Sequence, residues 1–151
     1  MNFDLSGTNP TAWSSTGTFI GTPIGVGGPW NVTNATGTFN GIAITGVLST
    51  TNNGNIFYFN NKYYWPGPPV VDNAGIVVTL ADGGLVNYCY DSPNCANPGA
   101  YAALLWEPGV GTTFYNADSA SFTQHTPEPA TLALFGSSVL GLVGVMRRRI
   151  L

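Results

Sequence analysis

Residues 1–125 carry short runs of β-branched and aromatic residues separated by clusters of Gly, Pro, Asn and Asp, with little helical periodicity. Runs of this kind predict β-strands joined by turns. In one of them Ile42, Ile44 and Gly46 fall on one side and Ala43 and Thr45 on the other, the alternation of a half-buried strand. The predicted strands are Met1–Leu5, Gly17–Ile20, Trp30–Phe39, Ile42–Leu48, Asn55–Phe59, Ile76–Leu80, Leu85–Tyr90, Tyr101–Trp106, Thr112–Tyr115 and Ser119–Gln124.

The connections between these strands predict the fold class. Asp82-Gly83-Gly84 and Asn52-Asn53-Gly54-Asn55 are hairpin signals, because Gly and Asn tolerate the backbone conformations of tight turns. Short strands with turns at intervals of about 8–12 residues are typical of an antiparallel β-sandwich. We therefore expect an all-β domain over residues 1–123, with a jelly-roll or Ig-like sandwich.

A short repeat lies within the first strands. Thr16-Gly-Thr-Phe-Ile-Gly21 reappears as Thr36-Gly-Thr-Phe-Asn-Gly41, and Ile24 has a counterpart in Ile44. Two copies are too few for a solenoid. We interpret them as two strands of one sheet built on the same pattern.

The C-terminal segment has a different pattern. Residues 130–146 contain no charge, and as a helix these 17 residues would be about 25 Å long, close to the thickness of a hydrocarbon core. Arg147, Arg148 and Arg149 follow as a stop-transfer signal that stays in the cytoplasm. We predict a linker over 124–129, a single transmembrane helix over 130–146 and a basic cytoplasmic tail over 147–151. A buried core helix is the alternative, but no polar stripe at helical spacing supports it.

The tail also resembles a known sorting signal. Pro127-Glu128-Pro129, then an apolar segment, then an arginine cluster is similar to the PEP-CTERM signal of Gram-negative bacteria. The resemblance implies that an exosortase, a membrane-embedded transpeptidase, acts near Pro127, Glu128 and Pro129. It also implies an exported protein that passes through an inner-membrane intermediate to the cell surface or matrix. Proteins with this signal are commonly linked to exopolysaccharide and biofilm.

The N-terminus departs from that pattern. Proteins with this tail begin with a Sec signal peptide, whereas Met1-Asn-Phe-Asp-Leu-Ser-Gly7 has neither a basic nor an apolar leader region. We expect the sequence to be a shortened form of a longer one.

The charge of the chain argues against two classes of partner. Only 7% of residues are charged, and residues 1–126 carry six acids and one base, a net charge of −5. Such a surface cannot neutralise many phosphates, so we expect neither nucleic-acid binding nor electrostatic adhesion to anionic lipid.

Two cysteines flank a turn. In Cys89-Tyr-Asp-Ser-Pro-Asn-Cys95 the central residues favour a turn that would bring the two thiols within reach of each other. We predict a disulfide between Cys89 and Cys95, with two free thiols as the alternative. Two Cys and one His are too few for a closed zinc site, so no metal or other cofactor is expected.

Candidate chemistry is sparse. The single histidine, His125, lies in the predicted linker, and the acids Asp72, Asp82, Asp91, Glu107 and Asp118 lie mainly in predicted turns. We therefore predict no catalytic residues and a non-enzymatic surface or matrix protein. The alternatives are a carbohydrate-binding module, whose possible glycan contacts are Tyr63, Tyr64 and Trp65, and a polysaccharide-modifying enzyme with two converging carboxylates. For the three aromatic residues we favour the simpler interpretation, a loop whose rings cap one end of the sandwich core.

Overall fold

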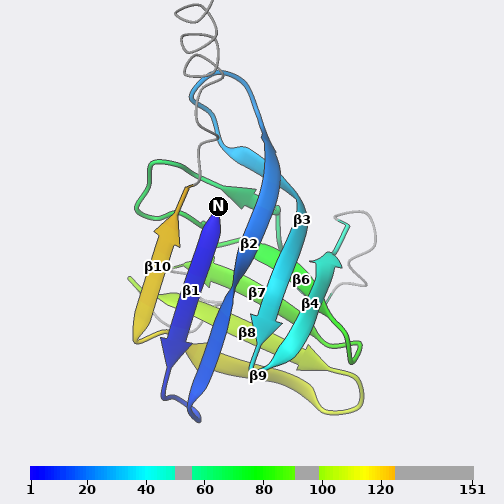
Figure 1. Ribbon diagram of the computed structural model, residues 1–151. Coiled ribbons are helices and arrows are strands. Elements are labelled where there is room, and N and C mark those ends of the chain that lie inside the picture. The colour runs from blue at the N-terminus through cyan, green and yellow to red at the C-terminus, as the bar shows by residue number, and fades with distance from the viewer. Residues whose placement is uncertain (50–55, 91–98, 125–151) are drawn as a thin grey trace, which may run out of the picture.

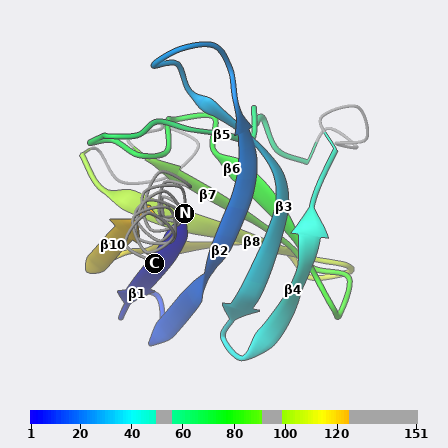
Figure 2. The same cartoon turned by 45° about the horizontal axis from the view of Figure 1, so that its top comes forward.

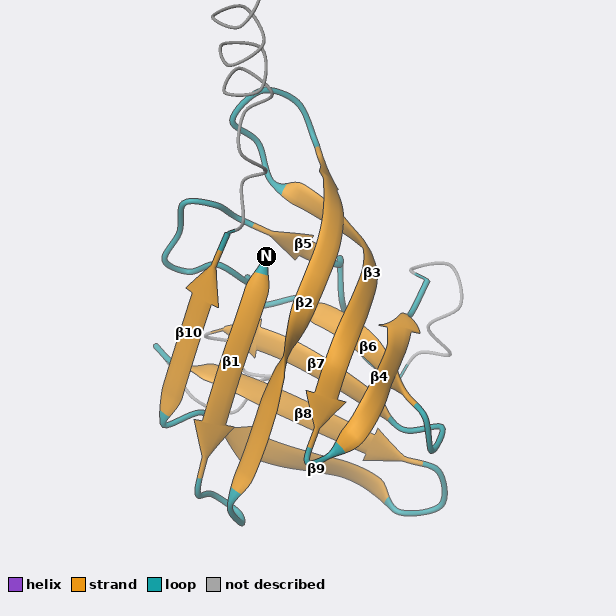
Figure 3. Ribbon diagram, in the orientation of Figure 1, coloured by secondary structure: helices purple, strands orange, loops and turns teal. Residues whose placement is uncertain are grey.

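The computed structural model describes residues 1–49, 56–90 and 99–124, and these residues form an all-β domain (Figure 3). The prediction of an antiparallel all-β domain is confirmed. The strands are β1 Asn2–Gly7, β2 Trp13–Pro23, β3 Trp30–Phe39, β4 Ile42–Val47, β5 Lys62–Tyr63, β6 Ile76–Leu80, β7 Leu85–Tyr90, β8 Tyr101–Glu107, β9 Gly111–Asn116 and β10 Ser119–Thr123.

All ten strands belong to one continuous sheet. Its order is β10-β1-β2-β3-β4-β6-β7-β8-β9, with the short β5 pairing with β3, and every pairing is antiparallel. The sheet curls on itself, so that the layer β10-β1-β2-β3-β4 crosses in front of the layer β6-β7-β8-β9 (Figures 1 and 2). The predicted jelly-roll or Ig-like sandwich is therefore corrected. Strands β1 to β4 and β6 to β9 pair in sequence as a meander, β4 pairs with β6, and β10 returns to pair with β1.

Two corners allow the sheet to curl. The register between β4 and β6 shifts between Ile44 and Gly46, and an irregularity of this kind bends a strand and increases its twist. At the other corner, β9 leads into β10 through Ala117 and Asp118. The Asp118 amide donates to the Ser6 carbonyl oxygen at 2.8 Å, and the Asp118 carboxylate accepts hydrogen bonds from the amide and hydroxyl of Thr8. These bonds hold the back layer to the front layer at this corner.

The main core fills the inside of the curl. Phe3 and Phe19 stack with ring centroids 4.3 Å apart, and Tyr88 of the back layer packs against both rings. The Tyr88 hydroxyl meets the hydroxyl of Ser15 at 2.5 Å in the middle of this core. The two layers are thus joined by aromatic packing and by one buried polar contact.

A second apolar cluster covers the outer face of the back layer. Val77, Cys89 and Leu104 lie on this face and are buried beneath Phe57 and Phe59. This packing explains why β6 is apolar on both faces. It also corrects the predicted strand Asn55–Phe59, because the described residues 56–59 form no strand and bury their rings by packing.

Most local predictions agree with the structure. The bounds of β3, β6 and β7 are those predicted, and the alternation in β4 leaves Ile44 buried and Thr45 exposed. The Asp82–Gly84 hairpin is confirmed: Gly83 has φ +88°, and the Gly84 amide donates to the Asp82 carboxylate at 2.9 Å. The predicted turn at 52–55 lies outside the described residues.

Within the described ranges, the structure contains no helix long and apolar enough to cross a bilayer. The predicted transmembrane helix 130–146 and the basic tail 147–151 lie outside those ranges.

Candidate functional site

The outer face of β10, β1, β2 and β3 carries a regular array of polar side chains. Strand register sets Thr123, Asn2, Thr18 and Thr36 in one row across the sheet. A second row contains Ser121, Asp4, Thr16 and Thr38. We call these eight residues the polar face.

The internal repeat builds the centre of this face. Its two copies pair with each other, so that Gly17 lies opposite Gly37 and the threonines on either side are cross-strand partners. A β-carbon at Gly17 would overlap the Thr36 carbonyl oxygen and lie 2.8 Å from the Phe3 ring. Glycine is therefore required here for β2 to approach β3 and for Phe3 to lie beneath the strand. This agrees with our interpretation of the repeat as two strands of one sheet, whereas exposed Ile24 and buried Ile44 are not equivalent.

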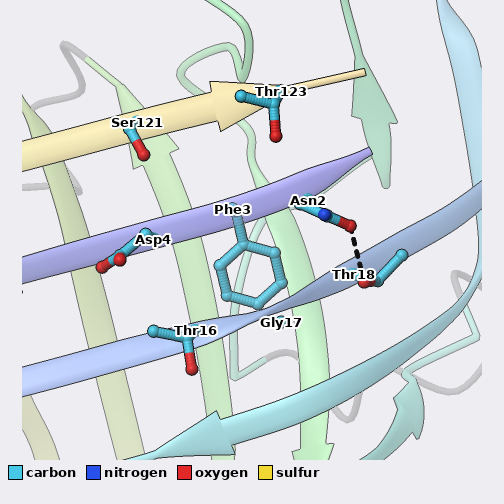
Figure 4. Close-up of a pocket in the computed structure, with 8 residues that line it drawn as sticks. All are labelled: Asn2, Phe3, Asp4, Thr16, Gly17, Thr18, Ser121 and Thr123. Carbon is cyan, nitrogen blue, oxygen red and sulfur yellow. Dashed lines mark hydrogen bonds between the residues drawn. The ribbon is translucent and has the colours of Figure 1, made fainter. Parts of the chain in front are cut away.

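A shallow depression of about 330 Å³ lies on the polar face, over β1, β2 and β10 (Figure 4). Most of the side chains that line it carry hydroxyl or amide groups, with Phe3 and Gly17 also in the lining, and the Thr18 hydroxyl donates to the Asn2 side-chain oxygen at 2.8 Å. Asp4 is the one ionisable side chain among the residues that line it. Hydroxyls both donate and accept hydrogen bonds, so this surface suits a polar, hydroxyl-bearing ligand. It offers no base beside a nucleophile and no second carboxylate.

The rings of the aromatic loop, candidate glycan contacts in the alternative interpretation, differ in exposure. Tyr63 is only 2% exposed and stacks on Trp30, with ring centroids 5.7 Å apart and planes at 9°. Tyr64 is half-buried, and its hydroxyl donates to Asp72 at 2.9 Å. Burial, followed by this hydrogen bond to a carboxylate, raises the pKa of Tyr64. Trp65 is 36% exposed, which leaves a single ring of the three with a substantial open face.

Asp72 organises that loop from below. One carboxylate oxygen accepts the amides of Ala74 and Gly75, both at 3.0 Å. The other accepts the Asn60 side-chain amide at 2.6 Å as well as the Tyr64 hydroxyl. A carboxylate with four donors fixes the loop geometry, and its acceptor sites are largely occupied.

Two of the other acids that were predicted to lie in turns also have structural roles. Asp82 and Asp118 accept backbone amides at turns, and Glu107 lies at the end of β8. Asp91 and His125 lie outside the described residues. Among residues 1–49, 56–90 and 99–124, no three His, Cys, Asp or Glu side chains gather as a metal site would require.

Sequence analysis missed two buried asparagines. The Asn61 side chain donates to the Leu48 carbonyl at 2.7 Å and accepts the Val77 amide at 2.9 Å, which ties the loop before β5 to two other segments. Asn87 donates to the Ala74 carbonyl at 3.1 Å. Both are polar residues in apolar surroundings, and only their tertiary neighbours identify the role.

One of the two cysteines of the predicted disulfide lies in the described domain. Cys89 is 2% exposed on the outer face of β7, within the second apolar cluster. Cys95 lies outside the described residues, so the Cys89–Cys95 bond stays a prediction. Pro127, Glu128, Pro129 and Arg147–Arg149 also lie outside them.

Comparison with known proteins identifies one segment. The PEP-CTERM protein-sorting motif matches residues 125–149, which contain Pro127-Glu128-Pro129, the apolar run and the arginine cluster. The resemblance predicted from these residues is therefore confirmed. No curated protein and no solved structure matches the chain.

Proposed function

Because the chain carries a PEP-CTERM sorting motif, we propose that it is an exported protein processed by an exosortase. The β-domain would be the cargo, and residues 130–146 would hold it in the inner membrane until the enzyme acts near Pro127-Glu128-Pro129. The arginines would keep the C-terminus in the cytoplasm, which places the β-domain on the other side of the membrane. The match to residues 125–149 is the observation that carries this proposal.

The final position of the protein is part of the same proposal. We propose a structural role at the cell surface or in the extracellular matrix, in association with exopolysaccharide or biofilm. A charge-poor face of Thr, Ser and Asn supports this, because uncharged hydroxyl and amide groups bind water and sugars without strong electrostatic preference.

The test uses the two glutamates of the chain as a matched pair. The full chain, with a Sec signal peptide before Met1, is produced in bacteria with and without an exosortase. We expect cleavage near residue 128 and release from the inner membrane only in the strain that contains the enzyme. Glu128→Gln should block this step, whereas Glu107→Gln at the end of β8 should not. A protein found only in the cytosol, or equal processing of both variants, contradicts the proposal.

We propose further that the β-domain is not an enzyme. The hydrogen bonds of Asp72, Asp82 and Asp118 to backbone amides support structural roles for these carboxylates. Polysaccharide cleavage that is lost in Asp4→Asn or Glu107→Gln would overturn this view.

A carbohydrate-binding module remains the second candidate, and the polar face is the surface that favours it. Its depression offers hydroxyls and one carboxylate at the spacing of adjacent strands, about 5 Å. A glycan array that detects binding by the wild type and not by Asp4→Ala/Thr16→Val would support this candidate. Binding that survives these changes and is lost in Trp65→Ala would instead assign it to the aromatic loop.

A further inference from the structure

One hairpin extends beyond the rest of the sheet. β2 and β3 continue past the level of Thr18 and Thr36 to a turn closed by the Ile24 amide, which donates to the Pro29 carbonyl at 2.8 Å (Figure 1). Ile20 and Ile24 are 50% and 45% exposed, and Val26 at the tip is fully exposed. Residues 19–39 contain no charge. The molecule therefore presents an uncharged apolar projection, which we call the hairpin tip (residues 20–29).

The hairpin tip lies at the end of the domain from which the sorting tail leaves. Thr123, the last residue of β10, pairs with Asn2, and Asn2 pairs with Thr18. The end of β10 is thus level with the base of the projection, and both point the same way in Figure 1.

The reach of the two segments matches. From Thr18 to Ile24 there are six residues, so the projection extends about 20 Å at 3.3 Å per residue. From Gln124 to Ala130, the first residue of the apolar run, there are also six residues, which span at most about 20 Å. If residues 130–146 are in a bilayer, the hairpin tip is therefore long enough to reach the surface of that bilayer.

Aromatic residues lie beside the projection, on the domain side of its turn. Trp30 pairs with Pro23 in the hairpin and stacks on Tyr63, and Trp65 follows two residues later with an open face. Trp and Tyr are enriched where a protein meets the membrane interface, because their rings are apolar and their N–H or O–H groups stay hydrated. A protein at a bilayer surface places apolar residues deepest and aromatic residues at the level of the headgroups. The apolar hairpin tip and the aromatic residues behind it follow the same order.

We propose that the hairpin tip inserts into the interfacial region of the bilayer in which the tail is anchored. This rests on the proposed function, since it takes the tail to be in the membrane. The partner is the lipid itself, and the contact is apolar: residues 1–126 carry a net charge of −5, so electrostatic attraction to anionic lipid plays no part. Lipid contact would fix the orientation of the β-domain and hold Pro127-Glu128-Pro129 at the membrane surface, where an embedded transpeptidase acts.

The experiment uses the full chain in phosphatidylcholine nanodiscs, with an environment-sensitive fluorophore on one added cysteine at a time. Val26→Cys reports on the tip. Val110→Cys is the matched control, because Gly25-Val26-Gly27 and Gly109-Val110-Gly111 have the same sequence, all four glycines have positive φ, and Val110 is 75% exposed in the β8–β9 turn. Leu140→Cys reports on the tail. The chain without an added cysteine gives the background from Cys89 and Cys95.

We expect the fluorophore at position 26 to emit at shorter wavelength in nanodiscs and to be quenched by lipids with a doxyl group near the headgroup. The fluorophore at position 110 should show neither change. Position 140 should be quenched by doxyl groups deeper in the bilayer. Circular dichroism checks that each variant keeps its β-structure.

The outcomes separate the two proposals. If position 140 is in lipid and position 26 stays in water, the hairpin proposal is wrong while the membrane anchor stands. If position 140 is in water, the proposed function itself fails. A wavelength shift at position 26 that depends on protein concentration and is insensitive to lipid quenchers would indicate a second copy as the partner, which also overturns the proposal.

Discussion

The buried contact between Ser15 and Tyr88 gives the sharpest test of how the curled sheet is held together. Ser15 is 1% exposed on β2, and Tyr88 is 1% exposed on β7. The Ser15 hydroxyl donates to the Thr38 carbonyl at 2.8 Å, which uses its only hydrogen. The Tyr88 hydroxyl must then donate to Ser15, so the chain of bonds runs from the back layer through β2 to β3.

This direction makes the two single substitutions unequal. Tyr88→Phe removes the terminal donor and leaves the Ser15–Thr38 bond intact, so we expect a loss of about 1 kcal/mol in the free energy of unfolding. Ser15→Ala removes two hydrogen bonds and leaves the Tyr88 hydroxyl buried without an acceptor, for which we expect about 2–3 kcal/mol. In the double variant no orphaned hydroxyl remains, so its loss should fall short of the sum of the single losses by about 1 kcal/mol.

Urea unfolding of the full chain in detergent micelles, followed by circular dichroism, measures these differences. Ser14→Ala is the control, because Ser14 is the exposed neighbour on the outer face and its substitution should change stability by less than about 0.5 kcal/mol. A Ser15→Ala loss no larger than that of Tyr88→Phe, or additive losses in the double variant, would refute the direction assigned to this chain of bonds.

Three further predictions concern the buried tyrosines, the glycine at the centre of the β2–β3 pair and the two cysteines. Burial raises the pKa of Tyr63, Tyr64, Tyr88, Tyr101 and Tyr115, so stability should be complete below pH 10, where both states keep these protons, and should fall above it. A pH series of urea midpoints should show this fall, with a shallower slope in Tyr88→Phe. Gly17→Ala should cost about 1–3 kcal/mol, because its β-carbon meets the Thr36 carbonyl oxygen, whereas Gly46→Ala, with its nearest atom at 3.7 Å, should be close to neutral in the same titration. Mass spectrometry of the exported protein without reductant should find Cys89 and Cys95 in one cross-linked peptide, and recovery of both as alkylated thiols would contradict the predicted disulfide.

Local patterns were sufficient where neighbours in the sequence are also neighbours in space. The alternation in β4 and the Asp-Gly-Gly turn between β6 and β7 were predicted correctly, because each depends on residues a few positions apart. The sorting motif is of the same kind, since its proline-flanked glutamate, apolar run and arginines follow one another within residues 125–149.

Long-range pairing was not predictable in this way. The polar face exists because β10 pairs with β1, a contact between residues more than 110 positions apart, and alternating polar residues alone do not say which strands will abut. The curl has the same origin. A meander and a Greek key have the same short strands and turns, and only the pairing partners distinguish them.

The aromatic residues show that residue type alone does not predict whether a side chain is buried or exposed. Phe57 and Phe59 lie in an aromatic run of the kind typical of a strand, yet they pack outside any strand on a second apolar face whose existence depends on β6, β7 and β8. As a sugar contact, the role it has in the alternative of a carbohydrate-binding module, Tyr63 would need an open face, yet it is covered by Trp30, 33 positions earlier in the chain. The exposed fraction of a side chain depends on which distant residues pack over it as much as on the residue type. For this reason Val26, whose short turn holds it clear of any partner within the described domain, supports an argument about an external contact, whereas Tyr63 does not.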